Sequence, residues 1–148
     1  MNTPDLRPRI LHQAGCVAVA GRGILIEGPP GSGKTSLALL LLDRGAALVG
    51  DDGVEISLQH GRMWASPPPH TAGKLEIRNV GIVDLPASPA PVALRLILSA
   101  DAPRFVEEAA ITEIAGASIP TLVFDGTGPA AAIRAEYALT VHGLALQK

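Results

Sequence analysis

A short run near the N-terminus has the composition of a loop that binds phosphate groups. It matches the pattern G-x-x-x-x-G-K-[ST] and consists of Gly28, Pro29, Pro30, Gly31, Ser32, Gly33, Lys34 and Thr35. Glycines let the backbone turn several N–H groups toward an anion, and a helix that starts behind the loop adds the positive end of its dipole. Lys34 supplies a cation for the β- and γ-phosphates, and the Thr35 hydroxyl is a hard oxygen ligand for Mg²⁺. The motif predicts a nucleotide and Mg²⁺ as ligands, but alone it does not separate a kinase, an ATPase and a GTPase.

Two adjacent carboxylates, Asp51 and Asp52, follow the apolar segment of residues 46–50. At the carboxyl end of a strand beside the phosphate loop, such carboxylates can hold Mg²⁺ or accept the proton of a hydroxyl substrate. Adjacent residues on a strand point to opposite faces, so the two need not share a role. Asp-Asp-Gly is also common in simple turns, and that interpretation stays open from these residues alone. His12, which precedes the first predicted strand, can orient a carboxylate, although a lone histidine is more often structural.

The segments on either side of the phosphate loop fit the strand and the helix that such a loop requires. Residues 16–20 and 23–27 predict two strands around a turn at Gly21-Arg22, because they are rich in β-branched residues and flanked by glycines. Residues 33–44 predict a helix that is apolar nearly all round and therefore well buried, with Gly45 as its C-cap. Residues 46–50 predict the strand that leads into the carboxylates.

The second half of the chain has a different pattern. Short β-rich segments separated by Gly and Pro fill residues 53–100 and predict an antiparallel or mixed sheet, with loops at residues 67–69 and 86–91. Residues 103–116 are ambiguous, whereas residues 119–124 predict a late strand. Residues 129–142 predict a closing helix with Pro129 in its first turn. The predicted fold class is α/β with a mixed, β-rich sheet.

Length and composition exclude several classes of protein. The 148 residues fit one domain, predicted over residues 9–148 behind a polar, flexible arm of residues 1–8. The net charge of -2 argues against a nucleic-acid partner. No apolar run is long enough to cross a membrane, and the N-terminus lacks the apolar segment of a signal peptide. Cys16, the one cysteine, lies in an apolar run and is predicted as a core residue. These features predict a soluble cytoplasmic protein.

Taken together, these residues resemble the HPr kinase/phosphorylase family. That family has a histidine ahead of two strands, a phosphate loop, a helix that ends in Arg-Gly, and the sequence Leu-Val-x-Asp-Asp; the counterparts here are His12, GILIEGPPGSGKT, Arg44-Gly45 and LVGDD. Its second signature is LEIRNVGIVDL in this chain, with Leu75, Glu76, Ile77, Arg78, Gly81, Ile82 and Asp84 in place. The similarity implies a short form that consists of the C-terminal catalytic domain only. The implied fold is a P-loop kinase-like core of the PEP carboxykinase-like type.

The resemblance implies how the proton and the phosphate are handled. Asp52 would be the proton acceptor during phosphorylation, and which of Asp51 and Asp52 acts as the base stays open from the residues themselves. His12 would pair with these two carboxylates. Lys34 would hold phosphate.

The resemblance also implies a metal site and two cationic groups. Thr35 and Glu76 would hold Mg²⁺, which takes few protein carboxylates and fills its shell with water and phosphate oxygens. Arg78 would stabilise charge on the transferred phosphoryl group. Arg104 corresponds to an active-site arginine that follows the second signature.

The sequence departs from the family pattern at several positions. Thr35-Ser36 replaces Ser-Glu, which keeps the hydroxyl, and Ala46 replaces a histidine after Arg-Gly. Asn79 replaces a glycine and tolerates a positive φ better than most residues. A basic stretch that resembles part of the dephosphorylation machinery is replaced by PTLVFDGTG, which leaves the reverse phosphorylase activity open.

The implied function is transfer of the γ-phosphoryl group of ATP to a serine of a small HPr-like phosphocarrier protein. The family further implies a homo-oligomer, a hexamer. The net charge and the lack of a long apolar run predict neither a nucleic acid nor a membrane as partner. One alternative is a P-loop small-molecule kinase, which would usually carry an arginine-rich lid that is not obvious here. Another is a non-catalytic nucleotide-sensing regulatory module, against which the presence of Lys34, Asp52 and Glu76 argues.

Overall fold

The computed structural model describes residues 9–146, so the predicted arm of residues 1–8 lies outside the described residues. This part of the chain forms eleven strands and two helices. In chain order they are β1 (Ile10–His12), β2 (Gly15–Val19), β3 (Arg22–Glu27), α1 (Lys34–Asp43), β4 (Ala47–Gly50), β5 (Val54–Gln59), β6 (Arg62–Ser66), β7 (Lys74–Ile77), β8 (Gly81–Asp84), β9 (Ala90–Leu98), β10 (Ala110–Ile114), β11 (Ala117–Phe124) and α2 (Ala131–His142).

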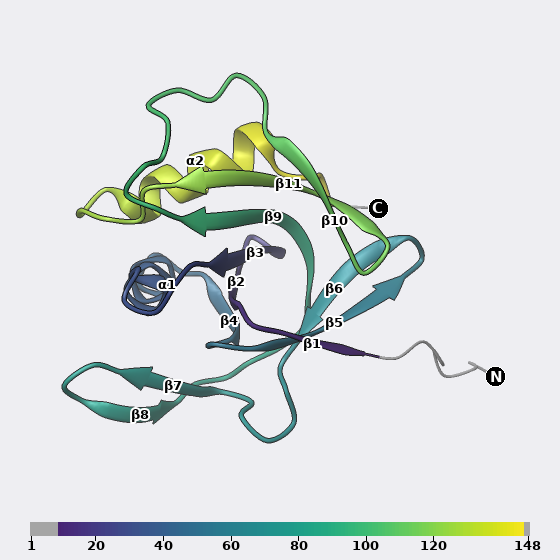
Figure 1. The fold of residues 1–148 in the computed structure, drawn as a ribbon. Helices are drawn as coiled ribbons and strands as arrows, with labels where there is room; N and C mark the ends of the chain where they lie inside the picture. The colour runs from purple at the N-terminus through teal and green to yellow at the C-terminus, as the bar shows by residue number, and fades with distance from the viewer. Residues whose placement is uncertain (1–8, 147–148) are drawn as a thin grey trace.

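Nine strands form one curled mixed sheet, which confirms the predicted fold class (Figure 1). The order is β1-β5-β6-β9-β3-β2-β4, and β11 also pairs with β9 and carries β10 on its outer side. The long strand β9 joins the two halves, because its first residues pair with β6 and the rest pair with β3 and β11. Strands β3, β9 and β11 are parallel, so their carboxyl ends at Glu27, Leu98 and Phe124 meet at one edge of the sheet. We call it the loop edge, because the phosphate loop starts there.

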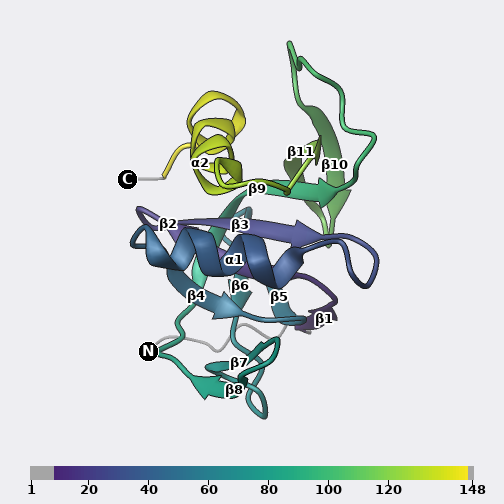
Figure 2. The ribbon, with the colours of Figure 1, turned by 90° about the vertical axis from the view of Figure 1, so that its left-hand side faces the viewer.

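Both helices pack on the same face of the sheet (Figure 2). The helix residues in this core are Leu37, Ala38 and Leu41 of α1 and Ala131, Ala132, Ala135 and Leu139 of α2. They meet Ile24, Ile26, Leu94 and Leu96 of the central strands. The α1 helix is buried on this side only, and Leu40 on its other side is 36% exposed. The prediction that α1 is well buried therefore holds only for the side that faces the sheet and α2, because within the described residues nothing else covers the helix.

The opposite face of the sheet is covered by its own curled end. Strands β1, β5 and β6 fold over it, and the enclosed core includes Leu25, Val54, Ile56 and Met63. Cys16 belongs to this core and is fully buried, as predicted, and burial raises the pKa of its thiol to about 12. A thiol in this state packs as a small apolar group.

Strands β7 and β8 form a separate two-stranded hairpin below the main sheet in Figure 1. Its turn contains Asn79 with a φ of 67°, which agrees with the expectation that this residue accepts a left-handed backbone. Leu75 is buried, whereas Val80 and Ile82 are exposed. The hairpin carries the whole second signature outside the main sheet.

Several predicted boundaries shift by one or two residues. The β2–β3 turn lies at Ala20-Gly21, both with positive φ, and not at Gly21-Arg22. Pro91 lies inside β9 instead of in a loop, and α2 begins two residues after Pro129. The ambiguous region contains β10. In the described chain, neither helix is long and apolar enough to cross a membrane.

Candidate nucleotide and phosphoryl-transfer site

The phosphate loop connects the end of β3 to the start of α1 at the loop edge, as predicted. Gly33 is the N-cap of α1 with a φ of 95°, a left-handed conformation that favours glycine. At Gly28, an added Cβ would lie 2.5 Å from the hydroxyl oxygen of Ser32. The loop therefore curls tightly on itself, and the lack of a side chain at Gly28 allows the Ser32 hydroxyl to lie close to the backbone.

Several hydrogen-bond donors of the loop are free within the described residues. The backbone N–H groups of Gly33, Lys34 and Thr35 have no partner there, and the first turn of α1 contains no acidic residue. The buried hydroxyl of Ser32 also lacks a hydrogen-bond partner. The Lys34 ammonium donates to the carbonyl oxygens of Gly28 (2.7 Å) and Pro29 (3.4 Å). Unpaired N–H groups at a helix start form a site that favours an anion.

Asp51 lies directly behind this loop, immediately after β4 ends at Gly50. The Thr35 hydroxyl donates to Asp51 Oδ1 at 3.2 Å, and the backbone N–H of Glu76 donates to Asp51 Oδ2 at 3.3 Å. Burial is the largest influence on this carboxyl group and raises its pKa, and the charges of Asp52 and Glu76 act in the same direction. The two hydrogen bonds oppose this rise without cancelling it. Asp51 thus connects the phosphate loop to the β7–β8 hairpin through hydrogen bonds. Among the described residues, its carboxylate forms no ion pair with a basic side chain.

Asp52 occupies the turn between β4 and β5 and is exposed. Its φ of 66° is in the left-handed region, which Asp adopts more readily than most residues. No hydrogen bond or ion pair from residues 9–146 restrains its carboxylate. Asp51 and Asp52 therefore follow the strand instead of lying on it, and they differ in burial.

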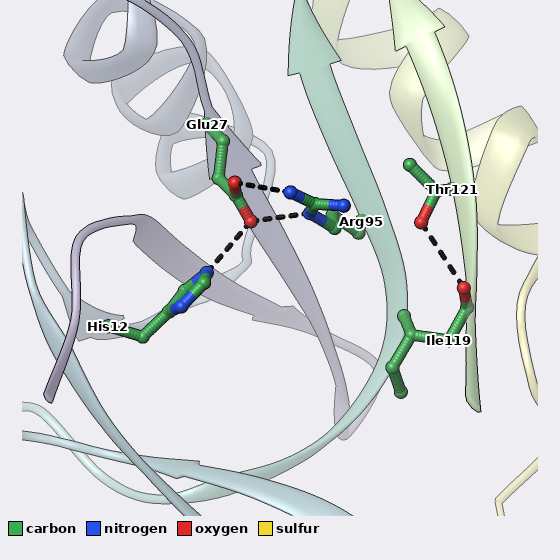
Figure 3. Close-up of polar contacts among 5 residues, drawn as sticks. All are labelled: His12, Glu27, Arg95, Ile119 and Thr121. Atoms are coloured by element: carbon green, nitrogen blue, oxygen red, sulfur yellow. Dashed lines mark hydrogen bonds and ion pairs between the residues drawn. The ribbon is translucent and has the colours of Figure 1, made fainter. Parts of the chain in front are cut away.

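The ring of His12 does not pair with the Asp51-Asp52 carboxylates, in contrast to the expectation. Its Nε2 lies 2.9 Å from Glu27 Oε2, and Arg95 holds the same carboxylate through Nε at 2.6 Å and Nη2 at 2.8 Å (Figure 3). Glu27 is the last residue of β3, directly before the phosphate loop, and its carboxylate is the partner of the His12 ring. We call these three residues the Glu27 cluster.

Sequence reasoning missed Glu27 and Arg95. The signal was present, because both are charged residues within or at the end of apolar strands, GILIE and VALRLIL. A charge at such a position is rarely buried unless it is paired. Burial would raise the pKa of Glu27, but the hydrogen bonds and charges of His12 and Arg95 outweigh it and lower the pKa to about 2.

Two arginines predicted for the site stand apart from it. Arg78 is exposed at the turn of the β7–β8 hairpin. Arg104 lines a cavity of about 440 Å³ between the segment after β9, β11 and α2, together with Phe105 and Arg134. Neither guanidinium contacts the phosphate loop or its carboxylates within the described chain. Glu76 is near Asp51 through its backbone, and its own carboxylate is exposed.

Comparison with known proteins identifies the family of this chain. A family model described as HPr Serine kinase C-terminal domain matches residues 5–88, more than half of the chain. An HPr kinase/phosphorylase of Clostridium tetani is 48% identical over 71 residues, which cover 48% of this chain and 23% of the relative. One from Clostridium novyi is 43% identical over 82 residues, which cover 55% of this chain and 27% of the relative. The chain thus matches about a quarter of the length of these relatives.

A solved structure shows the same fold. The Hpr(Ser) kinase/phosphatase from Coxiella burnetii superimposes with a TM-score of 0.75 at 22% sequence identity, over 88% of this chain and 98% of that chain. At this identity the likeness concerns the fold, and the family follows from the sequence match over residues 5–88. This chain belongs to the HPr serine kinase C-terminal domain family.

Proposed function

We propose that this chain is a protein-serine kinase that transfers the γ-phosphoryl group of ATP to a serine of a small HPr-like phosphocarrier protein. The observation that carries the proposal is the contact of Thr35 with Asp51 behind a phosphate loop whose last N–H groups, those of Gly33, Lys34 and Thr35, have no partner among the described residues. The names of the relatives, HPr kinase/phosphorylase, point to the same reaction and the same substrate.

The residues present fit a nucleotide phosphate and a magnesium ion. The unpartnered Ser32 hydroxyl and the close curl at Gly28 form a polar cradle. Thr35, Asp51 and Glu76 offer the hard oxygen atoms that Mg²⁺ prefers, with Thr35 and Glu76 as the proposed ligands. In residues 9–146, no group of three His, Cys, Asp or Glu side chains is arranged to hold a metal. Mg²⁺ at such sites ordinarily uses one or two carboxylates and completes its shell with water and phosphate.

The protein residues act mainly by placing and neutralising charge. Lys34 turns from the loop carbonyls to the phosphates, and the N–H groups at the start of α1 hold the same oxygen atoms. Mg²⁺, when bound, neutralises charge on the phosphates during transfer. The serine oxygen forms a bond to the γ-phosphorus, the bond from that phosphorus to the bridging oxygen breaks, and Asp52 accepts the proton of the hydroxyl. Asp52 suits this role because its carboxylate is exposed and unrestrained within the described chain.

The arginines and the histidine are assigned supporting roles. Arg78 and Arg104 lie on an exposed hairpin and an exposed segment, and we propose that they approach the phosphoryl group when both substrates are bound. His12 lies beside the turn of Asp51 and Asp52 through the pairing of β1 with β5. Since PTLVFDGTG replaces a basic stretch, we propose that the kinase direction dominates over the phosphorylase direction. We also propose that the enzyme works in the cytoplasm as a homo-oligomer.

The test is incubation of the purified protein with Mg²⁺ and γ-labelled ATP in the presence of an HPr-like phosphocarrier. Label is expected on the phosphocarrier, and none on a variant whose acceptor serine is alanine or in reactions with the Lys34→Ala enzyme. Label on a small metabolite instead would support the small-molecule kinase alternative. Nucleotide binding without any transfer would support a regulatory module and contradict the proposal.

A further inference from the structure

The Glu27 cluster lies at the root of the phosphate loop, on the face of the sheet away from the helices. Glu27 is directly followed by Gly28, and its side chain shares a face with Leu25, which belongs to the core under β1, β5 and β6. The side chains of His12, Glu27 and Arg95 are 24%, 15% and 18% exposed. Glu27 is therefore a largely buried carboxylate that contacts two basic groups and belongs to the last residue of β3, directly before the phosphate loop.

The strand that carries His12 has little else to fix it. β1 has three residues and pairs with β5 alone among the described strands, and Ile10 and Leu11 are 50% and 66% exposed. In that pairing His12 is opposite Val54, which follows Asp52 by two residues. The bond from His12 to Glu27 therefore connects two parts of the site, the Asp51-Asp52 turn and the base of the phosphate loop (Figure 3).

The proton on the bond between His12 and Glu27 can be assigned. Glu27, with a pKa of about 2, is ionised at neutral pH and can only accept hydrogen bonds. His12 must therefore carry a proton on Nε2. Arg95 contacts both oxygens of Glu27, so the carboxylate cannot rotate away from the ring without breaking a two-point contact. Nδ1 is then the ring nitrogen that Glu27 leaves available.

We propose that Glu27, held by Arg95, is a positioning residue that fixes the ring of His12 beside the Asp51-Asp52 turn with its Nε2 protonated. The inference rests on the proposed function, because a fixed His12 affects phosphoryl transfer only if transfer occurs at this site. Loss of Glu27 leaves the phosphate loop in place but releases the histidine. The expected consequence is a lower kcat with little change in KM for ATP.

The variant that tests the proposal is Glu27→Leu/Arg95→Leu. Replacing both members of a buried ion pair by apolar residues is often neutral for stability, whereas removing one member leaves an unpaired buried charge. The matched control is Glu136→Gln, which breaks the Arg44–Glu136 ion pair between the two helices. We expect kcat for phosphocarrier phosphorylation to fall about 10- to 100-fold in the double variant and to stay at the wild-type value in the control. KM for ATP should stay within about twofold.

A double-mutant cycle separates positioning from a purely structural role. In a His12→Ala background, the Glu27→Leu/Arg95→Leu change should produce no further loss of kcat, because its effect acts through His12. An equal loss in both backgrounds, or a double variant with wild-type kcat, would overturn the proposal.

A second readout does not depend on activity. In ¹⁵N NMR spectra of the wild-type protein, the Nε2 of His12 should have the shift of a protonated ring nitrogen, and the double variant should lose this preference. A wild-type ring protonated only on Nδ1 would refute the assignment even in an active enzyme. If the wild-type protein transfers no phosphoryl group while its Nε2 is protonated as expected, the proposed function fails and the geometry of the Glu27 cluster stands.

Discussion

Asp51 and Glu27 are partly buried carboxylates at the same edge of the sheet, in opposite electrostatic surroundings. Glu27 contacts Arg95 and His12, and its pKa falls to about 2. Asp51 has a hydroxyl and an N–H group as partners, and burial together with Asp52 and Glu76 raises its pKa. Ion pairs from the described residues reach Glu27 but neither Asp51 nor Asp52.

The difference indicates which carboxylates have their charge neutralised by side chains of this chain and which need a cation from outside. A buried acid with two basic contacts is already compensated. An acid grouped with other acids, next to a loop with free N–H groups, is stabilised when a cation enters and neutralises the group. This contrast supports the proposal that the Asp51 side serves Mg²⁺ and substrate chemistry, whereas the Glu27 side positions other residues.

The largest effect is expected for Lys34→Ala, which removes the cation of the loop. Lys34 is the positively charged side chain of the phosphate loop, so transfer should fall by about 10³-fold or more, with weaker binding of Mg·ATP and an intact fold. Transfer rates and nucleotide affinity measure this directly, and circular dichroism checks the fold. Unchanged affinity and activity would remove the basis for a nucleotide site.

Asp52→Asn should reduce transfer by about 10²- to 10⁴-fold while ATP binding is nearly retained. Asparagine keeps the shape and also tolerates the left-handed backbone, but it cannot accept the proton in the same way. Single-turnover rates and binding titrations separate the two quantities. If Asp51→Asn is the more damaging change for transfer with normal ATP binding, the roles of the two aspartates are exchanged.

Acid should destabilise the protein through Glu27. Its pKa is lowered from 4.5 to about 2 on folding, so its contribution is present above pH 4.5 and is lost as the pH falls toward 2. The full shift corresponds to about 3 kcal/mol, and solvent screening at this partly exposed site makes the contribution smaller. In urea titrations, the difference in unfolding free energy between the wild type and Glu27→Leu/Arg95→Leu should shift in favour of the variant across that pH range. A difference independent of pH would contradict the assignment of Glu27 as a compensated acid.

The smallest effect is expected for the ion pair between Arg44 and Glu136, which joins the C-terminal end of α1 to the middle of α2 at 2.9 Å. The Arg44 side chain is 46% exposed, so its interaction is screened by water and salt. Glu136→Gln should change the free energy of unfolding by less than about 1 kcal/mol. A larger loss of unfolding free energy would show that an exposed ion pair in this protein can stabilise the fold as much as a buried one.

Much of the fold followed from local sequence patterns. The glycine-rich motif between a β-branched segment and a Leu-rich segment predicted β3, the loop and α1 within two residues. The order of strands in the sheet could not be predicted, because the pairing of β9 with both β3 and β6 brings together residues far apart in the chain. The half-exposed side of α1 was missed for a related reason, since burial depends on which layers cover the helix.

The candidate site divides in the same way. The contact between Thr35 and Asp51 agrees with a motif in which strand ends position carboxylates beside the loop. The partner of His12 did not follow from the sequence, because it depends on a side-chain contact across the curled sheet. Glu27 and Arg95 are separated by 68 positions and become neighbours only through the parallel pairing of β3 and β9. The roles of Arg78 and Arg104 remain predictions that need the substrates in place.

The most direct test of the account is the affinity for ATP measured by calorimetry with and without Mg²⁺, in the wild type and in Asp51→Asn. If the acidic group behind the loop requires a cation, Mg²⁺ should strengthen ATP binding to the wild type by about tenfold or more, equivalent to about 1.4 kcal/mol. Most of this gain should disappear in Asp51→Asn and be retained in the Glu136→Gln control. Equal ATP affinity with and without Mg²⁺ in the wild type, or a full gain in Asp51→Asn, would contradict the assignment.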